Sequence, residues 1–249
     1  MKTNYKLNNK FADFSNFLNN IQQYFIENKQ SIHKARNELK IINYQDIDTI
    51  VKSFKVPSTI SKIIYTFFRS SKAKRSYDYS LKINHFCPEP IGYIEFYKNG
   101  LIDKSYFISV KFDYDFTIRE ALHKSLPNTS EEEYLHIYKA FAKFSCQLHD
   151  NNIFHHDYSP GNILIKKVKQ DYDFKIVDIN RMTFKVINAE MRARSFSKLW
   201  AHEGILKVIA EEYLKYYPQA DEGFIKNVLN FSQKIKKIKT LKKKILMRK

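Results

Sequence analysis

The stretch from Ile153 to Arg181 constrains this chain more than any other part of its sequence. Asp157 is followed five residues later by Asn162, which leads directly into the apolar run Ile-Leu-Ile. A second apolar run, Lys-Ile-Val, ends at Asp178. The Pro-Gly pair before Asn162 supplies a fixed turn, so the pattern predicts a rigid loop followed by a short β-hairpin. Such a hairpin brings the second Asp beside the first Asp and the Asn.

An Asp, an Asn and a second Asp gathered in this order are typical of kinase-like phosphotransferases. Asp157 is expected to orient an acceptor hydroxyl and accept its proton, while Asn162 and Asp178 hold the magnesium ion on ATP. We therefore predict ATP and Mg²⁺ as cofactors. The competing interpretation is a turn with incidental polar residues before an ordinary hairpin. The joined motif is more specific than a lone Asp-x4-Asn and favours the phosphotransferase.

A strand lysine and a helical acid are expected to complete the nucleotide site. Lys52 lies in the strand-like run 48–54, which precedes a helical segment. In kinases such a lysine pairs with the ATP phosphates and with an acid on the following helix. Asp78 is the best acid available here, one methylene shorter than the usual Glu. The alternative is that Lys52 is a solvated strand lysine, with Lys55 as its competitor.

A glycine-rich phosphate loop is absent, because the first glycine in the chain is Gly92. We expect the phosphates to be approached around Ala35-Arg36-Asn37, where Arg36 adds positive charge. Asp113 opens an Asp-Tyr-Asp segment that is predicted at the hinge between two lobes and assigned to nucleotide binding. The missing loop argues against an ordinary protein kinase, and it leaves a pseudokinase-like binding module as an alternative.

The first half of the chain reads as antiparallel strands interrupted by helix. Apolar spacing at three and four residues predicts a helix over 11–27, and Pro57 marks the start of a helical segment over 58–84. The polar link Gln45-Asp46 and the turn Lys98-Asn99-Gly100 suit hairpins. The strands that these links join are expected at 38–44, 48–54, 91–97 and 106–112.

The second half is predominantly helical. A helix is expected over 116–124, and Ser130-Glu-Glu-Glu is a capping-box pattern that opens another helix to about Asp150. A strand pair at 163–168 and 174–179 follows. We predict an α+β, bilobal protein-kinase-like fold with a β-rich N-lobe (1–115), a mainly helical C-lobe (116–233) and a basic C-terminal tail (234–249).

The charge of the chain is strongly positive and unevenly spread. The net charge is +17, and residues 234–249 hold nine Lys or Arg and no acid. Ile235, Ile238, Leu241 and Ile245 recur at three and four residues, which suits a cationic amphipathic helix on an anionic membrane. A solubilising tail is the alternative. Nucleic acid is disfavoured, because aromatic residues do not interleave with the lysines.

The histidines near the motif invite a metal-hydrolase interpretation. His149-Asp150 and His155-His156-Asp157 superficially resemble metal clusters. We favour a packing and hydrogen-bonding role for His155, two residues before Asp157. His156 stands where regulated kinases carry Arg, so a clamp for a phosphorylated activation loop is not expected. Asn180 stands where kinases carry Gly after the second Asp, and because Asn tolerates the left-handed conformation nearly as Gly does, the turn remains feasible there.

These motifs together resemble the bacterial lipopolysaccharide core kinases, the Kdo/heptose kinase family with its InaA-like relatives. The resemblance rests on His-x-Asp-x-Ser-Pro-Gly-Asn-Ile-Leu at 155–164, Val-Asp-Ile-Asn-Arg at 177–181, Lys52 in its strand, the basic segment 71–76 and Pro88-x-Pro-Ile-Gly-Tyr93. It runs from about Arg36 to Trp200. The chain departs from the family by Asp at position 78 and by the glycine-free nucleotide loop.

The resemblance implies ATP-dependent phosphorylation of an inner-core sugar hydroxyl at the cytoplasmic face of the membrane. The expected partners are lipopolysaccharide or a lipid-linked glycan, together with an anionic membrane surface contacted by the basic tail; no protein partner is expected. No apolar run approaches the ~20 residues that span a bilayer, and the N-terminus lacks a signal peptide. We expect a cytoplasmic protein, peripheral at the inner face of the cytoplasmic membrane. A protein or small-molecule kinase of the same fold is the alternative.

Overall fold

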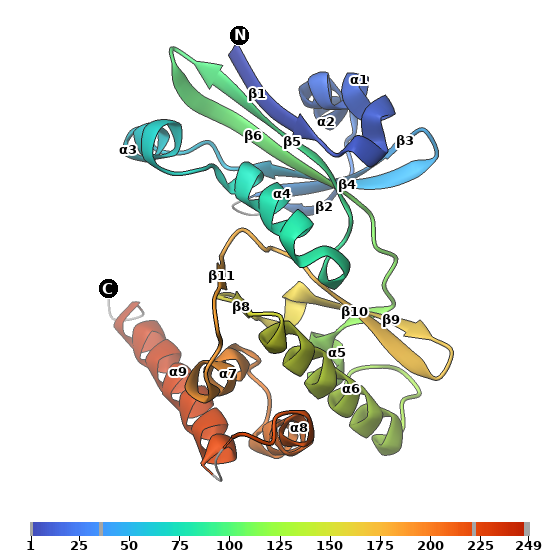
Figure 1. Ribbon diagram of the computed structural model, residues 1–249, viewed down its shortest axis with the longest axis vertical. Helices are drawn as coiled ribbons and strands as arrows, with labels where there is room; N and C mark the ends of the chain where they lie inside the picture. Colours follow the sequence, from blue (N-terminus) through green and yellow to red (C-terminus); the bar gives the residue numbers. More distant parts are fainter. Residues whose placement is uncertain (1, 35–36, 221–222, 247–249) are drawn as a thin grey trace. The chain divides into compact units, whose positions relative to one another are not determined.

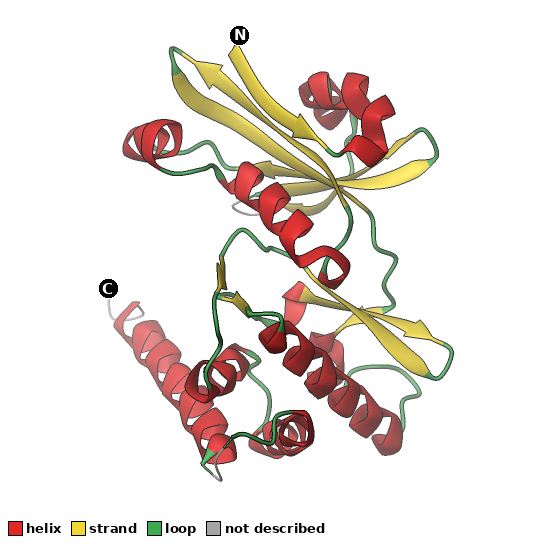
Figure 2. Cartoon of the chain, in the orientation of Figure 1, coloured by secondary structure: helices red, strands yellow, loops and turns green. Residues whose placement is uncertain are grey.

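The computed structural model describes residues 2–34, 37–220 and 223–246. The chain divides into two compact units, Met1–Phe112 and Asp113–Lys249. Unit 1 is built around one large sheet, and unit 2 is mostly helical (Figure 2). The boundary between the two units falls directly before Asp113, the first residue of the Asp-Tyr-Asp segment.

Unit 1 holds a six-stranded antiparallel sheet with the order β1-β5-β6-β4-β3-β2 (Figure 1). Its strands are β1 (Lys2–Leu7), β2 (Ser31–Lys34), β3 (Glu38–Tyr44), β4 (Ile47–Phe54), β5 (Pro90–Lys98) and β6 (Leu101–Val110). Its helical segments are η1 (Asn9–Phe14), α1 (Ser15–Asn19), α2 (Ile21–Glu27), α3 (Thr59–Ile63), η2 (Ile64–Phe68), α4 (Lys72–Ile83) and η3 (Asn84–Phe86).

Alternation along β4 distributes its side chains between two helical layers. Val51 is fully buried in a core that includes Phe17 and Leu18 of α1. Phe54 packs on the other side with Tyr77 of α4 and with residues of the sheet. Because successive strand residues point to opposite faces, β4 contributes to both cores. The sheet is therefore covered by η1, α1 and α2 on one face and by α4 on the other.

Strands β3, β4 and β5 lie where the sequence predicted them, whereas β6 begins at Leu101, before the predicted range of 106–112. Both predicted hairpin turns are confirmed. Gln45 and Asp46 have φ of 49° and 60°, and Asn99 and Gly100 have φ of 52° and 77°. Two residues with positive φ fit the tight turn that joins twisted antiparallel strands.

The prediction of one helical segment over 58–84 is wrong, because the segment is not continuous. It breaks into α3, the π-helical turn η2 and, after Arg69–Ser71, the separate helix α4. Ser71 caps α4, because its side chain accepts a hydrogen bond from the Lys74 N–H at 3.0 Å. The helix expected over 11–27 likewise forms as η1, α1 and α2, and β1 and β2 were not foreseen.

Unit 2 combines two small sheets with a helical body. Its strands are β7 (Phe116–Thr117), β8 (Ile153–His155), β9 (Ile163–Val168), β10 (Asp171–Ile176) and β11 (Met182–Phe184), with β10-β9-β7 in one sheet and β11-β8 in the other. Its helices are α5 (Ile118–Leu122), α6 (Glu131–Asp150), η4 (Pro160–Asn162), α7 (Ala189–Ser195), η5 (Phe196–Lys198), α8 (Glu203–Tyr216) and α9 (Phe224–Leu246). The helix expected over 116–124 begins as β7, and the strand expected over 174–179 is displaced toward the N-terminus.

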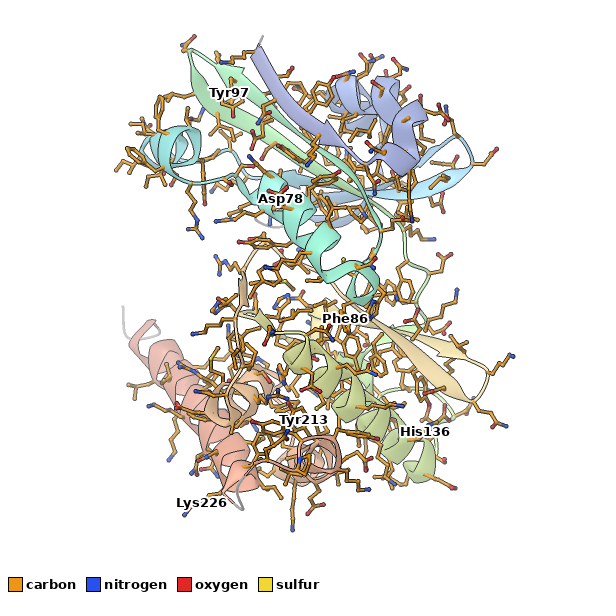
Figure 3. All side chains as sticks on the ribbon, viewed as in Figure 1. Asp78, Phe86, Tyr97, His136, Tyr213 and Lys226 are labelled. Atoms are coloured by element: carbon orange, nitrogen blue, oxygen red, sulfur yellow. The ribbon has the colours of Figure 1, made fainter. Side chains whose placement is uncertain are left out.

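Tyr213 of α8 lies at the centre of the helical body of unit 2 (Figure 3). Its hydroxyl is 2.8 Å from His149 Nδ1 on α6 and accepts a hydrogen bond from Arg192 Nη1 on α7 at 3.0 Å. Arg192 also donates to Asp150 at 2.7 Å. This network satisfies polar groups in the interior and ties three helices together.

Helix α9 is continuous across residue 234, where the basic segment begins. Phe224 and Val228 in its first turns are buried, and the Phe224 ring stacks on Tyr213 with 5.3 Å between centroids. Farther along, Ile235 is half-buried, whereas Ile238 and Leu241 are exposed. Across the part of the chain that the structure describes, no helix combines the length and apolar character needed to cross a membrane.

Candidate functional site

A tight loop between β8 and β9 carries Asp157 and Asn162. The Ser159 N–H donates to the Asp157 carbonyl at 2.7 Å, and the Asn162 N–H donates to the Ser159 carbonyl at 2.9 Å. Gly161 is closely approached by Arg119 of α5: a Cβ at this position would lie 2.5 Å from Arg119 Nη2. The loop is therefore fixed by its own backbone and has no room for a side chain at Gly161 unless Arg119 moves.

His155 fastens this loop to the chain just before Asp178. Its Nδ1 accepts a hydrogen bond from the Asp157 N–H at 3.0 Å, so Nε2 carries the proton and donates to the Val177 carbonyl at 3.1 Å. Burial lowers the pKa of His155, although the Val177 hydrogen bond and the carboxylates of Asp157 and Asp178 oppose the shift. A neutral imidazole with this tautomer has one acceptor and one donor, as the two contacts require.

Asn162 connects the loop to the second apolar strand. Its side-chain Nδ2 donates to the Asp157 carbonyl at 3.0 Å, and its backbone carbonyl accepts from the Val177 N–H at 2.9 Å. Together with His155, these contacts bring Asp157, Asn162 and the residue before Asp178 into one cluster within unit 2. The amide oxygen of Asn162 is the remaining side-chain group that can act as a metal ligand.

Asp178 itself has the left-handed conformation, with φ of 57°. Asn180, whose residue type tolerates the left-handed conformation, does not adopt it. Asn180 is buried and donates from Nδ2 to Asp178 Oδ1 at 2.7 Å. Asp adopts positive φ more readily than most residues. The turn is thus made at the acid, and the Asn orients its carboxylate.

Basic side chains lie near His156, at the start of the loop. Lys198 Nζ lies 3.7 Å from Asp157 Oδ1 and donates to the His156 carbonyl. The pKa of His156 is lowered by partial burial and then by the positive charges of Lys198, Arg181, Arg194 and Lys185. Sequence reasoning missed Lys198, because it is far from Asp157 in the chain and belongs to no recognisable motif. Its place on η5 comes only from the fold.

Unit 1 places Lys52 and Asp78 on the same side of its sheet. Lys52 Nζ lies 5.4 Å from the centroid of the Phe54 ring, which packs against α4. Asp78 is half-buried on α4 (Figure 3). Burial, then the charges of Glu95 and Asp78, raise the pKa of Tyr93 to about 12. Asp78 is therefore close to the tyrosine of β5 that packs beneath α4.

The remaining two residues predicted to bind the nucleotide are Arg36 and Asp113, and the structure says little about either side chain. Arg36 lies outside the described residues. The next residue, Asn37, accepts a hydrogen bond from the Lys55 N–H at 3.3 Å. Asp113 is the first residue of unit 2.

The histidines of the metal-hydrolase interpretation are engaged in protein contacts. His149 is bonded to Tyr213, and both ring nitrogens of His155 are used within the loop. Among residues 2–34, 37–220 and 223–246, no group of three or more His, Cys, Asp or Glu is arranged to hold a metal ion. These contacts favour the packing role for His155 over the metal-ligand role.

A hollow of about 840 Å³ lies elsewhere in unit 2, between α5, α6 and the start of α8. Leu122, Tyr138, Trp200 and Val208 contribute to its wall. Its described lining includes no residue of the 157–162 loop and not Asp178, so it is separate from the candidate site.

Comparison with known proteins relates the fold, but not the sequence, to a solved structure. No family model matches the sequence, and no curated protein matches it. The structure of WaaP in complex with acyl carrier protein matches with a TM-score of 0.58 and 11% identity, covering 93% of this chain and 98% of that chain. The predicted fold class is confirmed by this match: the chain has a mixed α/β, bilobal kinase-like fold.

Proposed function

We propose that this protein is an ATP-dependent kinase that phosphorylates a sugar hydroxyl of the lipopolysaccharide inner core, on Kdo or heptose. The observation that carries the proposal is the Asp157–Asn162 loop, fastened to the segment before Asp178 through His155 and bordered by Lys198. The motif resemblance to the lipopolysaccharide core kinases and the fold likeness to WaaP support the same class of activity.

The proposed roles follow from the contacts of each side chain. Asp157 receives the proton of the acceptor hydroxyl, because a carboxylate held on a rigid loop can be aimed at that group. His155 positions Asp157 through its backbone N–H. Lys198 offers a cation beside Asp157 where negative charge gathers during transfer.

The donor set also fits a hard divalent cation. Asn162 and Asp178 provide an amide oxygen and a carboxylate, which are the ligand types that Mg²⁺ prefers, and Asn180 orients the carboxylate of Asp178. Bound Mg²⁺ would neutralise the phosphate charge of ATP. In unit 1, Lys52 is assigned to the nucleotide phosphates and Asp78 to orienting Lys52. Arg36 and Asp113 are the further residues assigned to nucleotide binding.

The acceptor is inferred from charge. Inner-core glycans carry carboxylates and phosphates, and the loop is bordered by Lys198 and by the other cations that lower the pKa of His156. Opposite charge raises the local concentration of such an acceptor. A neutral small-molecule alcohol would gain nothing from this field.

The test is phosphate transfer from labelled Mg-ATP to dephosphorylated deep-rough lipopolysaccharide. We expect label in the glycan, with transfer that weakens as salt is raised because the acceptor is attracted by charge. Label in protein or in a small alcohol but never in the glycolipid would favour another kinase of the same fold. Failure to bind Mg-ATP in calorimetry would favour a pseudokinase-like module.

A further inference from the structure

The segment α3–η2 of unit 1 presents an apolar stripe to solvent. Ile60, Phe67 and Phe68 are 74%, 69% and 81% exposed, and Ile63 and Ile64 between them are also exposed. These five positions recur at three and four residues, which places them along one face of a helix. In a helix of a folded domain, that face is normally the one that is buried.

The polar face of the same segment is the one attached to the protein. Lys62 Nζ lies 2.5 Å from Asp103 Oδ1 of β6, and Thr66 Oγ1 accepts a hydrogen bond from the Ile102 N–H at 3.0 Å. Both residues are half-buried. These contacts hold α3 and η2 against the first residues of β6 with the polar side inward. The apolar side is therefore turned outward by specific contacts.

A second contact fixes the inward face toward α4. Arg75 of α4 is buried, and its guanidinium carbon lies 6.0 Å from the centroid of the Tyr65 ring. Tyr65 is half-buried, next to the two exposed isoleucines. In Figure 1, α3 stands at the side of unit 1 opposite α1 and α2. The outward stripe thus lies apart from the helices that build the main core.

The charge around this stripe has one sign. Between Asp48 and Asp78 the sequence contains seven Lys or Arg and no acid. Lys55 and Arg69 at the two ends of the segment are exposed, and Lys72 and Lys74 follow on α4, half-buried. An apolar face bordered by cations is the pattern of a helix that lies in the interface of an anionic bilayer.

We propose that α3–η2, residues 59–68, is a docking helix that inserts Ile60, Ile63, Ile64, Phe67 and Phe68 into an anionic lipid surface. The inference rests on the proposed function, because a glycolipid acceptor is embedded in such a surface. It assigns the main membrane contact to unit 1 and not to the basic segment of α9. A second copy of the chain is a poorer occupant, since two such surfaces would bring like charges together.

Vesicle co-sedimentation of the full chain, without ATP, tests the docking helix separately from kinase activity. Large vesicles of phosphatidylcholine with phosphatidylglycerol are compared with phosphatidylcholine alone. We expect Phe67→Ser/Phe68→Ser to lower partitioning onto the anionic vesicles by about 100-fold, because each ring removed from water contributes about tenfold. The control variant Ile26→Ser/Val186→Ser removes two equally exposed apolar side chains elsewhere and should bind as wild type.

Two further arms make the outcome decisive. Arg69→Gln should weaken anionic binding by about fivefold and leave the low binding to neutral vesicles unchanged. Equal sedimentation of wild type and the Phe67/Phe68 variant, with matching thermal unfolding, would overturn the proposal. A second result would also overturn the proposal. In it, wild type does not bind vesicles, and the Phe67/Phe68 variant loses self-association or the binding of an acidic carrier protein. Vesicle binding without any phosphate transfer would leave the docking helix standing and remove the proposed function.

Discussion

Replacing His155 with Phe should strongly impair the proposed phosphate transfer while leaving the protein folded. The Phe ring keeps most of the buried volume but has no ring nitrogens. The Asp157 N–H loses its acceptor at 3.0 Å, and the Val177 carbonyl loses its donor at 3.1 Å. The loop that carries Asp157 is then joined to the segment before Asp178 only through Asn162, which contacts the Asp157 carbonyl and the Val177 N–H.

The magnitude follows from those two contacts. A buried donor or acceptor left unsatisfied costs about 1–3 kcal/mol, so the pair is worth about 2–4 kcal/mol of unfolding free energy in this partly buried setting. Against a typical total of about 5–15 kcal/mol, the variant remains folded. A displacement of a catalytic group by about 1 Å costs on the order of 100-fold in rate. We therefore expect kcat to fall about 100-fold with little change in the KM for ATP.

His149→Phe is the matched control. His149 is also buried in unit 2 and also loses a hydrogen bond, at 2.8 Å to the Tyr213 hydroxyl, but it lies in the helical network away from the loop. Both variants should show similar losses in urea denaturation, whereas only His155→Phe should lose phosphate transfer. Wild-type transfer by a folded His155→Phe, or equal loss in both variants, would refute the positioning role.

Three other perturbations test particular contacts. Burial, aided by Arg192, lowers the pKa of His149 to about 3, so the folded protein holds this ring neutral. The full unfolding free energy is therefore available above the unfolded pKa near 6.5, and about 2 kcal/mol of it is lost on going to pH 5. Denaturation at pH 7.5 and at pH 5 should show a smaller loss of stability in His149→Phe than in wild type, and an equal loss would contradict this. Asn180→Ala removes the amide that orients Asp178, so half-saturation should need about tenfold more Mg²⁺, which a metal titration of activity measures. Lys198→Met removes the cation beside Asp157 and should reduce transfer about tenfold while changing stability by less than about 1 kcal/mol, since the exposed ion pair contributes little to folding.

The local geometry of the candidate site could be predicted from the sequence because its parts are close in the chain. Pro160-Gly161 and two apolar runs are enough to specify a turn followed by a hairpin. The hydrogen bonds of His155 involve Asp157, two residues along the chain, and Val177, which directly follows the second strand of that hairpin. What the sequence could not supply is Lys198, which reaches Asp157 only through the packing of η5.

The orientation of an amphipathic helix is a second limit. Periodicity at 60–68 reveals an apolar face, but the face normally turns inward, and the sequence pattern alone predicts a buried stripe. The contacts of Lys62 and Thr66 with β6 instead turn the polar face inward and leave the apolar face exposed. The conformation of Asp178 is a similar case, because residue type permits positive φ at both Asp178 and Asn180, and the structure has it at Asp178.

The most direct test of the central claim is single-turnover phosphate transfer by Asp157→Asn. The substitution keeps the size of the side chain and removes its ability to accept a proton. Mg-ATP affinity should remain near wild type, while the rate of transfer to the glycolipid should fall at least about 100-fold. Wild-type transfer by this variant would contradict the assignment of the 157–162 loop as the phosphotransfer centre.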